Sequence, residues 1–131
     1  MLSSLKRSGL VVGIVSTGLS LLAERVRSEH ALDHTISNEL VAENGVVTGD
    51  VLIHVAHGAK GRALLGFCDA FRIDAGAVAS VGDTEGDVSM FRASGFAVAF
   101  NPDGPEVRVA ADAVVQGVDL RALLPLLLSG Q

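Results

Sequence analysis

Two aspartates, Asp83 and Asp87, follow a short apolar run and precede a segment with the residue spacing of a helix. The apolar run, Ala77–Val81, is typical of a strand buried in an open α/β sheet, so both carboxylates would lie at its carboxyl end. Carboxylate oxygens there can bind a divalent cation, and the amino end of the next helix favours anions. The pattern predicts a site for a metal-bound phosphate. The same spacing also fits a capping box, in which Thr84 and Asp87 only begin the helix.

Two further groups could complete such a site. Ser16, Thr17 and Gly18 follow the apolar run Leu10–Val15, and a hydroxyl with two backbone amides could donate hydrogen bonds to phosphate oxygens. Lys60 begins a helical pattern and could supply a fixed cation. Simpler interpretations exist for each, namely a capped strand-to-helix turn and a solvated helix lysine. Their order, at matching ends of predicted elements, favours one shared site.

The elements that must position these residues are those of an α/β domain. The predicted strands are Leu10–Val15, Thr35–Ile36, Ala77–Val81, Phe96–Phe100 and Ala113–Val115, and the predicted helices are Leu2–Ser8, Ser20–Ser28, Lys60–Phe71, Val88–Ala93 and Leu120–Leu128. Asn44-Gly45 is a preferred hairpin turn, which predicts a β-hairpin at about residues 39–55. We expect a single domain over residues 1–131, built as a three-layer, Rossmann-like parallel sheet with this hairpin as an insertion.

The composition narrows the function classes. A formal net charge of −5 argues against a nucleic-acid partner, because phosphate backbones are bound by clustered Lys and Arg. The apolar stretch after Lys6-Arg7 resembles a signal peptide, but no small-residue cleavage site follows it, and it is too short to span a membrane. The lone cysteine, Cys68, cannot form an internal disulfide. We expect a cytoplasmic protein with neither a nucleic acid nor a membrane as partner.

The sequence resembles the family of haloacid-dehalogenase-like phosphatases, and within this family the phosphoserine-phosphatase-like branch. The segments that carry the resemblance are Leu5–Gly18 (the second motif with its preceding helix), Asn38–Leu40 with Asn44–Gly49 (the hairpin), Lys60 (the third motif), Val81–Phe91 (the fourth) and Ala97–Pro102 (the segment after it). The resemblance implies a hydrolase that removes phosphate from a small phosphorylated metabolite with the help of Mg²⁺.

The resemblance also implies a role for each candidate residue. These roles are phosphate binding by Ser16, Thr17, Gly18 and Lys60, magnesium ligation by Asp83, and catalysis by Lys60 and Asp87, with Asp87 acting through Lys60 or a water. Two positions depart from the family pattern. Thr84 stands where the family often has Gly, and Gly86 where it often has Asn, so the contact made by that Asn side chain is not expected here.

The family's first motif, an apolar strand ending in Asp-x-Asp, has no counterpart in these residues. Its first aspartate is the nucleophile, so we expect a partial phosphatase core that lacks the central first strand and the cap. Such a chain would bind Mg²⁺ weakly or not at all and would need a nucleophile-bearing strand from another segment or chain. The alternative is a non-catalytic remnant that binds phosphate or a partner. The gap would close by direct strand pairing, by a strand-donating partner chain, or by homo-oligomerisation.

Overall fold

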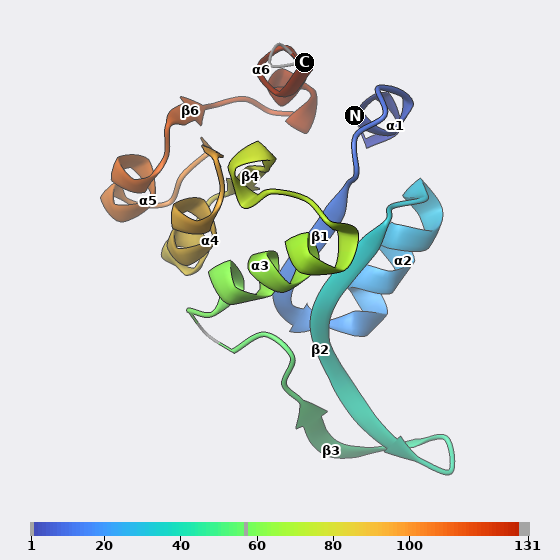
Figure 1. The fold of residues 1–131 in the computed structure, drawn as a ribbon. Coiled ribbons are helices and arrows are strands. Elements are labelled where there is room, and N and C mark those ends of the chain that lie inside the picture. Colours follow the sequence, from blue (N-terminus) through green and yellow to red (C-terminus); the bar gives the residue numbers. More distant parts are fainter. Residues whose placement is uncertain (1, 57, 129–131) are drawn as a thin grey trace. The chain divides into compact units, whose positions relative to one another are not determined.

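The computed structural model describes residues 2–56 and 58–128, which divide into two compact units, Leu2–His57 and Gly58–Gln131 (Figure 1). The elements are α1 (Leu2–Arg7), β1 (Gly13–Leu19), α2 (Ser20–His30), β2 (His34–Glu43), β3 (Val46–Leu52), α3 (Lys60–Phe71), η1 (Ala75–Ala77), β4 (Ala79–Gly82), η2 (Glu85–Asp87), α4 (Val88–Ala93), β5 (Phe96–Phe100), α5 (Pro105–Ala110), β6 (Ala113–Val115), η3 (Leu120–Leu123) and α6 (Leu124–Leu128). The predicted α/β class is confirmed. No helix in the described residues is long and apolar enough to cross a membrane.

The first unit contains a three-stranded sheet in the order β1-β2-β3. β1 and β2 run parallel, whereas β2 and β3 form an antiparallel hairpin that turns at Asn44 and Gly45. Both turn residues have positive φ, 52° and 79°, as a tight hairpin turn requires. The short strand predicted at Thr35–Ile36 is present, but it is the first part of β2, which continues from there into the hairpin without a break.

The start and the end of β1 both differ from the predicted Leu10–Val15. The strand begins later because the Asp33 carboxylate accepts the N–H of Val12 at 2.8 Å, and the Asp33 N–H donates to the Val12 carbonyl. The strand also runs on to Leu19, and its register against β2 shifts between Val15 and Leu19. Ser16, Thr17 and Gly18 therefore form an irregular stretch inside β1, and their prediction as a strand-to-helix turn is wrong.

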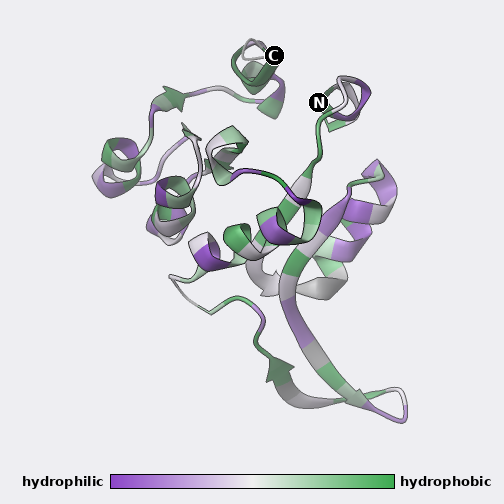
Figure 2. Cartoon of the chain, viewed as in Figure 1, coloured by the Kyte–Doolittle hydropathy of each residue, from purple (hydrophilic) through white to green (hydrophobic). Residues whose placement is uncertain are grey.

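The second unit contains a parallel sheet in the order β4-β5-β6, and its middle strand is the most deeply buried. In β5, Ala97, Val98 and Ala99 are at most 1% exposed, as the continuous apolar run predicts. Helix α3 has the predicted bounds and alternates apolar and polar colour along its length in Figure 2. It ends at Arg72, which adopts a left-handed conformation and donates its N–H to the last carbonyls of the helix.

Candidate functional site

The loop after β4 is closed by a buried carboxylate. Asp87 Oδ2 accepts the backbone N–H groups of Asp83 and Thr84 at 2.9 and 3.2 Å, and the side chain of Asp87 is only 5% exposed. The capping interpretation of Asp87 is therefore correct for these backbone contacts. It does not use the whole side chain, since the second carboxylate oxygen has a different partner.

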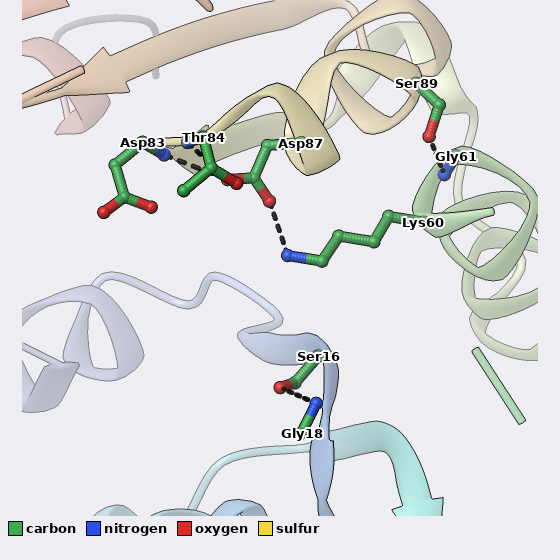
Figure 3. A network of polar contacts seen from close by, with 8 residues as sticks. All are labelled: Ser16, Gly18, Lys60, Gly61, Asp83, Thr84, Asp87 and Ser89. Atoms are coloured by element: carbon green, nitrogen blue, oxygen red, sulfur yellow. Dashed lines mark hydrogen bonds and ion pairs between the residues drawn. The ribbon is translucent and has the colours of Figure 1, made fainter. Parts of the chain in front are cut away.

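That partner is the Lys60 ammonium group, which lies 2.6 Å from Asp87 Oδ1 (Figure 3). Lys60 is the first residue of α3, where the sequence predicts it, and its side chain is 16% exposed. It is therefore an ion-paired and mostly buried lysine, and the solvated interpretation is wrong. The structure brings together two predicted site residues that are 27 positions apart in the chain.

Electrostatics keep this carboxylate ionised. Burial opposes ionisation of Asp87, but hydrogen bonds from Lys60 and from the N–H groups of Thr84 and Asp83 outweigh burial and lower the pKa of Asp87 below its ordinary value. A buried anion with three donors, one of them the paired cation, is satisfied, so the arrangement can hold the ammonium group of Lys60 at a fixed place.

Two glycines make these contacts geometrically accessible. A Cβ atom on Gly82 would stand 2.4 Å from the Asp87 carboxyl carbon, and one on Gly61 would stand 2.3 Å from the Ser89 carbonyl oxygen. The Gly61 N–H also donates to Ser89 Oγ at 3.0 Å (Figure 3), so α3 packs closely on the start of α4. Our sequence analysis missed these residues, although each glycine directly adjoins a predicted site residue.

Asp83 has the opposite character to Asp87. Its side chain is exposed, and no group in the described part of the chain bonds to its carboxylate. Its backbone is held, since the N–H donates to Asp87 and the carbonyl accepts the N–H of Asp103 at 2.9 Å. Free carboxylate oxygens are hard donors of the kind Mg²⁺ prefers. No group of three or more His, Cys, Asp or Glu among residues 2–56 and 58–128 could hold a metal, so Asp83 fits a metal only as one ligand.

The other predicted phosphate donors belong to the first unit. Ser16 Oγ accepts the N–H of Gly18 at 2.9 Å, so two of the expected phosphate donors are bonded to each other. The carbonyl of Thr17 accepts a hydrogen bond from the buried side chain of Asn38 at 2.9 Å. The same amide also accepts the N–H groups of His54 and Val55, and it thereby fixes this end of β1 to the segment after β3.

Asn38 is a positioning residue that our sequence analysis missed as such. In the sequence, Asn38 is identified only as part of the hairpin pattern. A polar amide in the middle of a strand, on the face that the two-residue alternation assigns to the apolar residues Ile36 and Leu40, is the signal that could have identified it, because a buried amide must be hydrogen-bonded.

The chain is similar to known hydrolases. The family model described as haloacid dehalogenase-like hydrolase matches residues 1–92. Phosphoserine phosphatase of Methanocaldococcus jannaschii is 32% identical over 94% of this chain, and phosphoserine phosphatase SerB2 of Mycobacterium tuberculosis is 34% identical over 95%. The chain spans 58% and 30% of these two relatives. A solved structure of a phospho-aspartyl intermediate analogue of phosphoserine phosphatase matches with a TM-score of 0.85 and 32% identity, over 95% of this chain and 60% of that one.

Proposed function

Because the chain belongs to the haloacid dehalogenase-like hydrolases, on their phosphoserine-phosphatase-like branch, we propose that it forms part of a magnesium-dependent phosphomonoester hydrolase. Its substrate would be a small phosphorylated metabolite, with phosphoserine the first to test, since the relatives are named as phosphoserine phosphatases.

The observation that carries this proposal is the ion pair between Lys60 and Asp87. A phosphoryl group in transfer carries negative charge on its non-bridging oxygens, and a cation already held in place stabilises that charge without reorganisation. Asp87 would act as a positioning residue that holds the ammonium group of Lys60 at a fixed place. Lys60 would contact the phosphoryl oxygens and stabilise the covalent intermediate.

The remaining donors would come from Ser16, Thr17 and Gly18. The Ser16 hydroxyl and the Thr17 N–H would donate to phosphate oxygens, and the Gly18 N–H would join them once its hydrogen bond to Ser16 Oγ opens. The side chain of Asn38 would keep the Thr17 peptide in place while this happens.

Asp83 would be the protein's carboxylate ligand to Mg²⁺ in this part of the chain, and the bound ion would neutralise charge on the substrate phosphate. With a single protein carboxylate in these residues, binding would be weak until further oxygen ligands join it, since Mg²⁺ demands near-octahedral coordination.

The nucleophile would be an aspartate that these residues do not include, since they contain no Asp-x-Asp. A similar solved structure is an analogue of a phospho-aspartyl intermediate, which supports an attacking carboxylate of this kind. We expect the strand that carries it to come from another segment or another chain. β1 and β4 are each an edge strand of their sheet, and either could accept such a strand by backbone pairing.

Complementation tests the proposal. The chain would be combined with a segment that carries an apolar strand ending in Asp-x-Asp, and phosphate release from O-phosphoserine would be measured with and without Mg²⁺. We expect Mg²⁺-dependent release that is abolished by Asp83→Asn and by Lys60→Met. Loss of the nucleophile typically costs about 10⁴–10⁶ in rate, so the chain alone should be inactive.

Two results would count against catalysis. No hydrolysis in a complex shown by NMR to contain the paired strand would reject the phosphatase. Retention of phosphate binding in that inactive complex would favour the alternative, a non-catalytic phosphate-binding remnant, and the binding should then disappear in Lys60→Met.

A further inference from the structure

The loop between β5 and α5 contacts the backbone of Asp83. The Asp103 N–H donates to the Asp83 carbonyl at 2.9 Å, whereas Asp87 holds the Asp83 N–H at the same distance. Both polar groups of the Asp83 backbone are thus hydrogen-bonded, one to its own loop and one to a different element. The place from which the Asp83 side chain projects depends on both contacts.

Asn101 anchors this second loop. Its side-chain amide donates to the Gly117 carbonyl at 2.8 Å and accepts the Gly117 N–H at 3.0 Å, while its own N–H donates to the Val115 carbonyl. Asn101 also has a φ of 46°, a left-handed conformation that turns the chain sharply just before Pro102. One residue therefore both bends the loop and ties it to the segment after β6.

We infer that Asn101 is a positioning residue for the metal ligand Asp83, acting through the Asp103 N–H. This inference rests on the proposed role of Asp83 in binding Mg²⁺. Asp83 is exposed and its carboxylate has no partner in the described residues, so only its backbone contacts limit where the carboxylate can stand. Release of the Asp103 contact would let the loop sample more conformations, and each bound cation would then have to order it.

Substitution by glycine separates the two functions of Asn101. Glycine adopts a positive φ without strain, so Asn101→Gly keeps the bend and removes only the two amide hydrogen bonds, whereas Asn101→Ala also strains the backbone. Asn44, the left-handed asparagine of the hairpin turn, provides a matched control in the first unit. Asn44→Gly should leave everything measured at Asp83 unchanged.

The test is an NMR titration with MgCl₂ of the full chain in complex with the Asp-x-Asp segment, which would supply further oxygen ligands, followed through the backbone amides of Asp83 and its neighbours. We expect Asn101→Gly to weaken Mg²⁺ binding by about fivefold, the effect of losing roughly one net hydrogen bond, and Asn101→Ala to weaken it further. Exchange of the Asp103 amide proton should accelerate by a similar factor without metal. The melting temperature is measured alongside, because a merely structural role would lower it without changing the affinity.

The outcomes separate the inference from the proposed function. If wild-type chain and Asp83→Asn respond identically to Mg²⁺, the metal role of Asp83 is wrong and the inference is overturned with it. If wild type binds Mg²⁺ at Asp83 and Asn101→Gly binds it equally well, the inference alone is overturned. Equal weakening in Asn44→Gly would also overturn it, since the effect would then not depend on the β5–α5 loop.

Discussion

The irregular stretch at the end of β1 and the loop after β4 each contain residues predicted to bind phosphate or metal, but they are held in different ways. In the loop after β4, a buried carboxylate accepts hydrogen bonds from two backbone N–H groups and from a lysine ammonium of a separate helix. In the stretch at the end of β1, the hydrogen-bond partner of the Ser16 side chain within the described residues is Gly18, two residues away. The first arrangement is fixed by tertiary packing, and the second by a local turn and the Asn38 contact.

This difference indicates how each region would meet a ligand. The ammonium group of Lys60 is already fixed in place, because its buried counterion Asp87 is itself held by two backbone N–H groups. In the β1 region the Gly18 N–H already donates to Ser16 Oγ, so a ligand must compete with this hydrogen bond for that N–H. The four predictions below test this contrast.

The largest effect is expected where α3 packs on α4. Gly61→Ala would place a methyl group against the Ser89 backbone, and backbone atoms cannot move aside cheaply, so we expect a loss of about 3 kcal/mol or more in the free energy of unfolding. Gly66, in the same helix, has no atom within 4 Å of its would-be Cβ. Gly66→Ala should therefore stabilise the protein by about 0.5–1 kcal/mol. Urea titrations measure both, and destabilisation by both would show that the packing argument is wrong.

The next effect compares two lysine–aspartate pairs, one in each unit. Lys60→Met removes a hydrogen bond to a buried carboxylate and should cost about 1.5–3 kcal/mol of unfolding free energy. Lys6→Met breaks the pair with Asp33, whose side chains are 28% and 27% exposed, and should cost about 0–1 kcal/mol. Equal costs in urea titrations would mean that the Lys60 pair is no better fixed than a surface pair.

A third prediction concerns acid. Because the pKa of Asp87 is lower in the folded chain than in the unfolded one, its stabilising contribution is complete above the ordinary aspartate pKa of about 4 and is lost as the pH falls through the lowered value. The stability difference between wild type and Asp87→Asn should therefore be constant near neutrality and shrink in acid. Urea midpoints across this range measure it. A difference that grows in acid would contradict the assigned shift.

Sequence reasoning worked best where one local signal decides the outcome. The bounds of α3 follow from its amphipathic spacing, and the hairpin turn follows from Asn44-Gly45. Lys60 and Asp87 could be proposed as partners because each stands at the start of a helical segment, a position visible in the sequence. These features depend on neighbours in the chain, which the sequence shows directly.

The rest depends on contacts between distant residues. The extension of β1 through Ser16 depends on Thr17 being held by Asn38, and the tight approach of α3 to α4 depends on which residue faces Gly61. The local pattern can mark Asn38 as a buried amide, but it does not show which carbonyl the amide bonds to, and no local signal identifies the residue that faces Gly61. The contact between the β5–α5 loop and Asp83 is likewise a hydrogen bond from a backbone N–H, that of Asp103, to a backbone carbonyl, that of Asp83. Side-chain types give no information about such a bond.

The smallest effect is expected at Ser16. Ser16→Ala removes one hydroxyl donor but releases the Gly18 N–H that now bonds to it, so phosphate would lose one partner and gain another. We expect inorganic phosphate to bind at most about threefold more weakly to Ser16→Ala, against about tenfold or more to Lys60→Met, where a charge-assisted contact is lost. Phosphate titrations followed by NMR measure both, with Ser16→Thr as the control that keeps the hydroxyl. A tenfold loss in Ser16→Ala would mean that the hydroxyl is already directed at the ligand. The contrast between the end of β1 and the loop after β4 would then disappear.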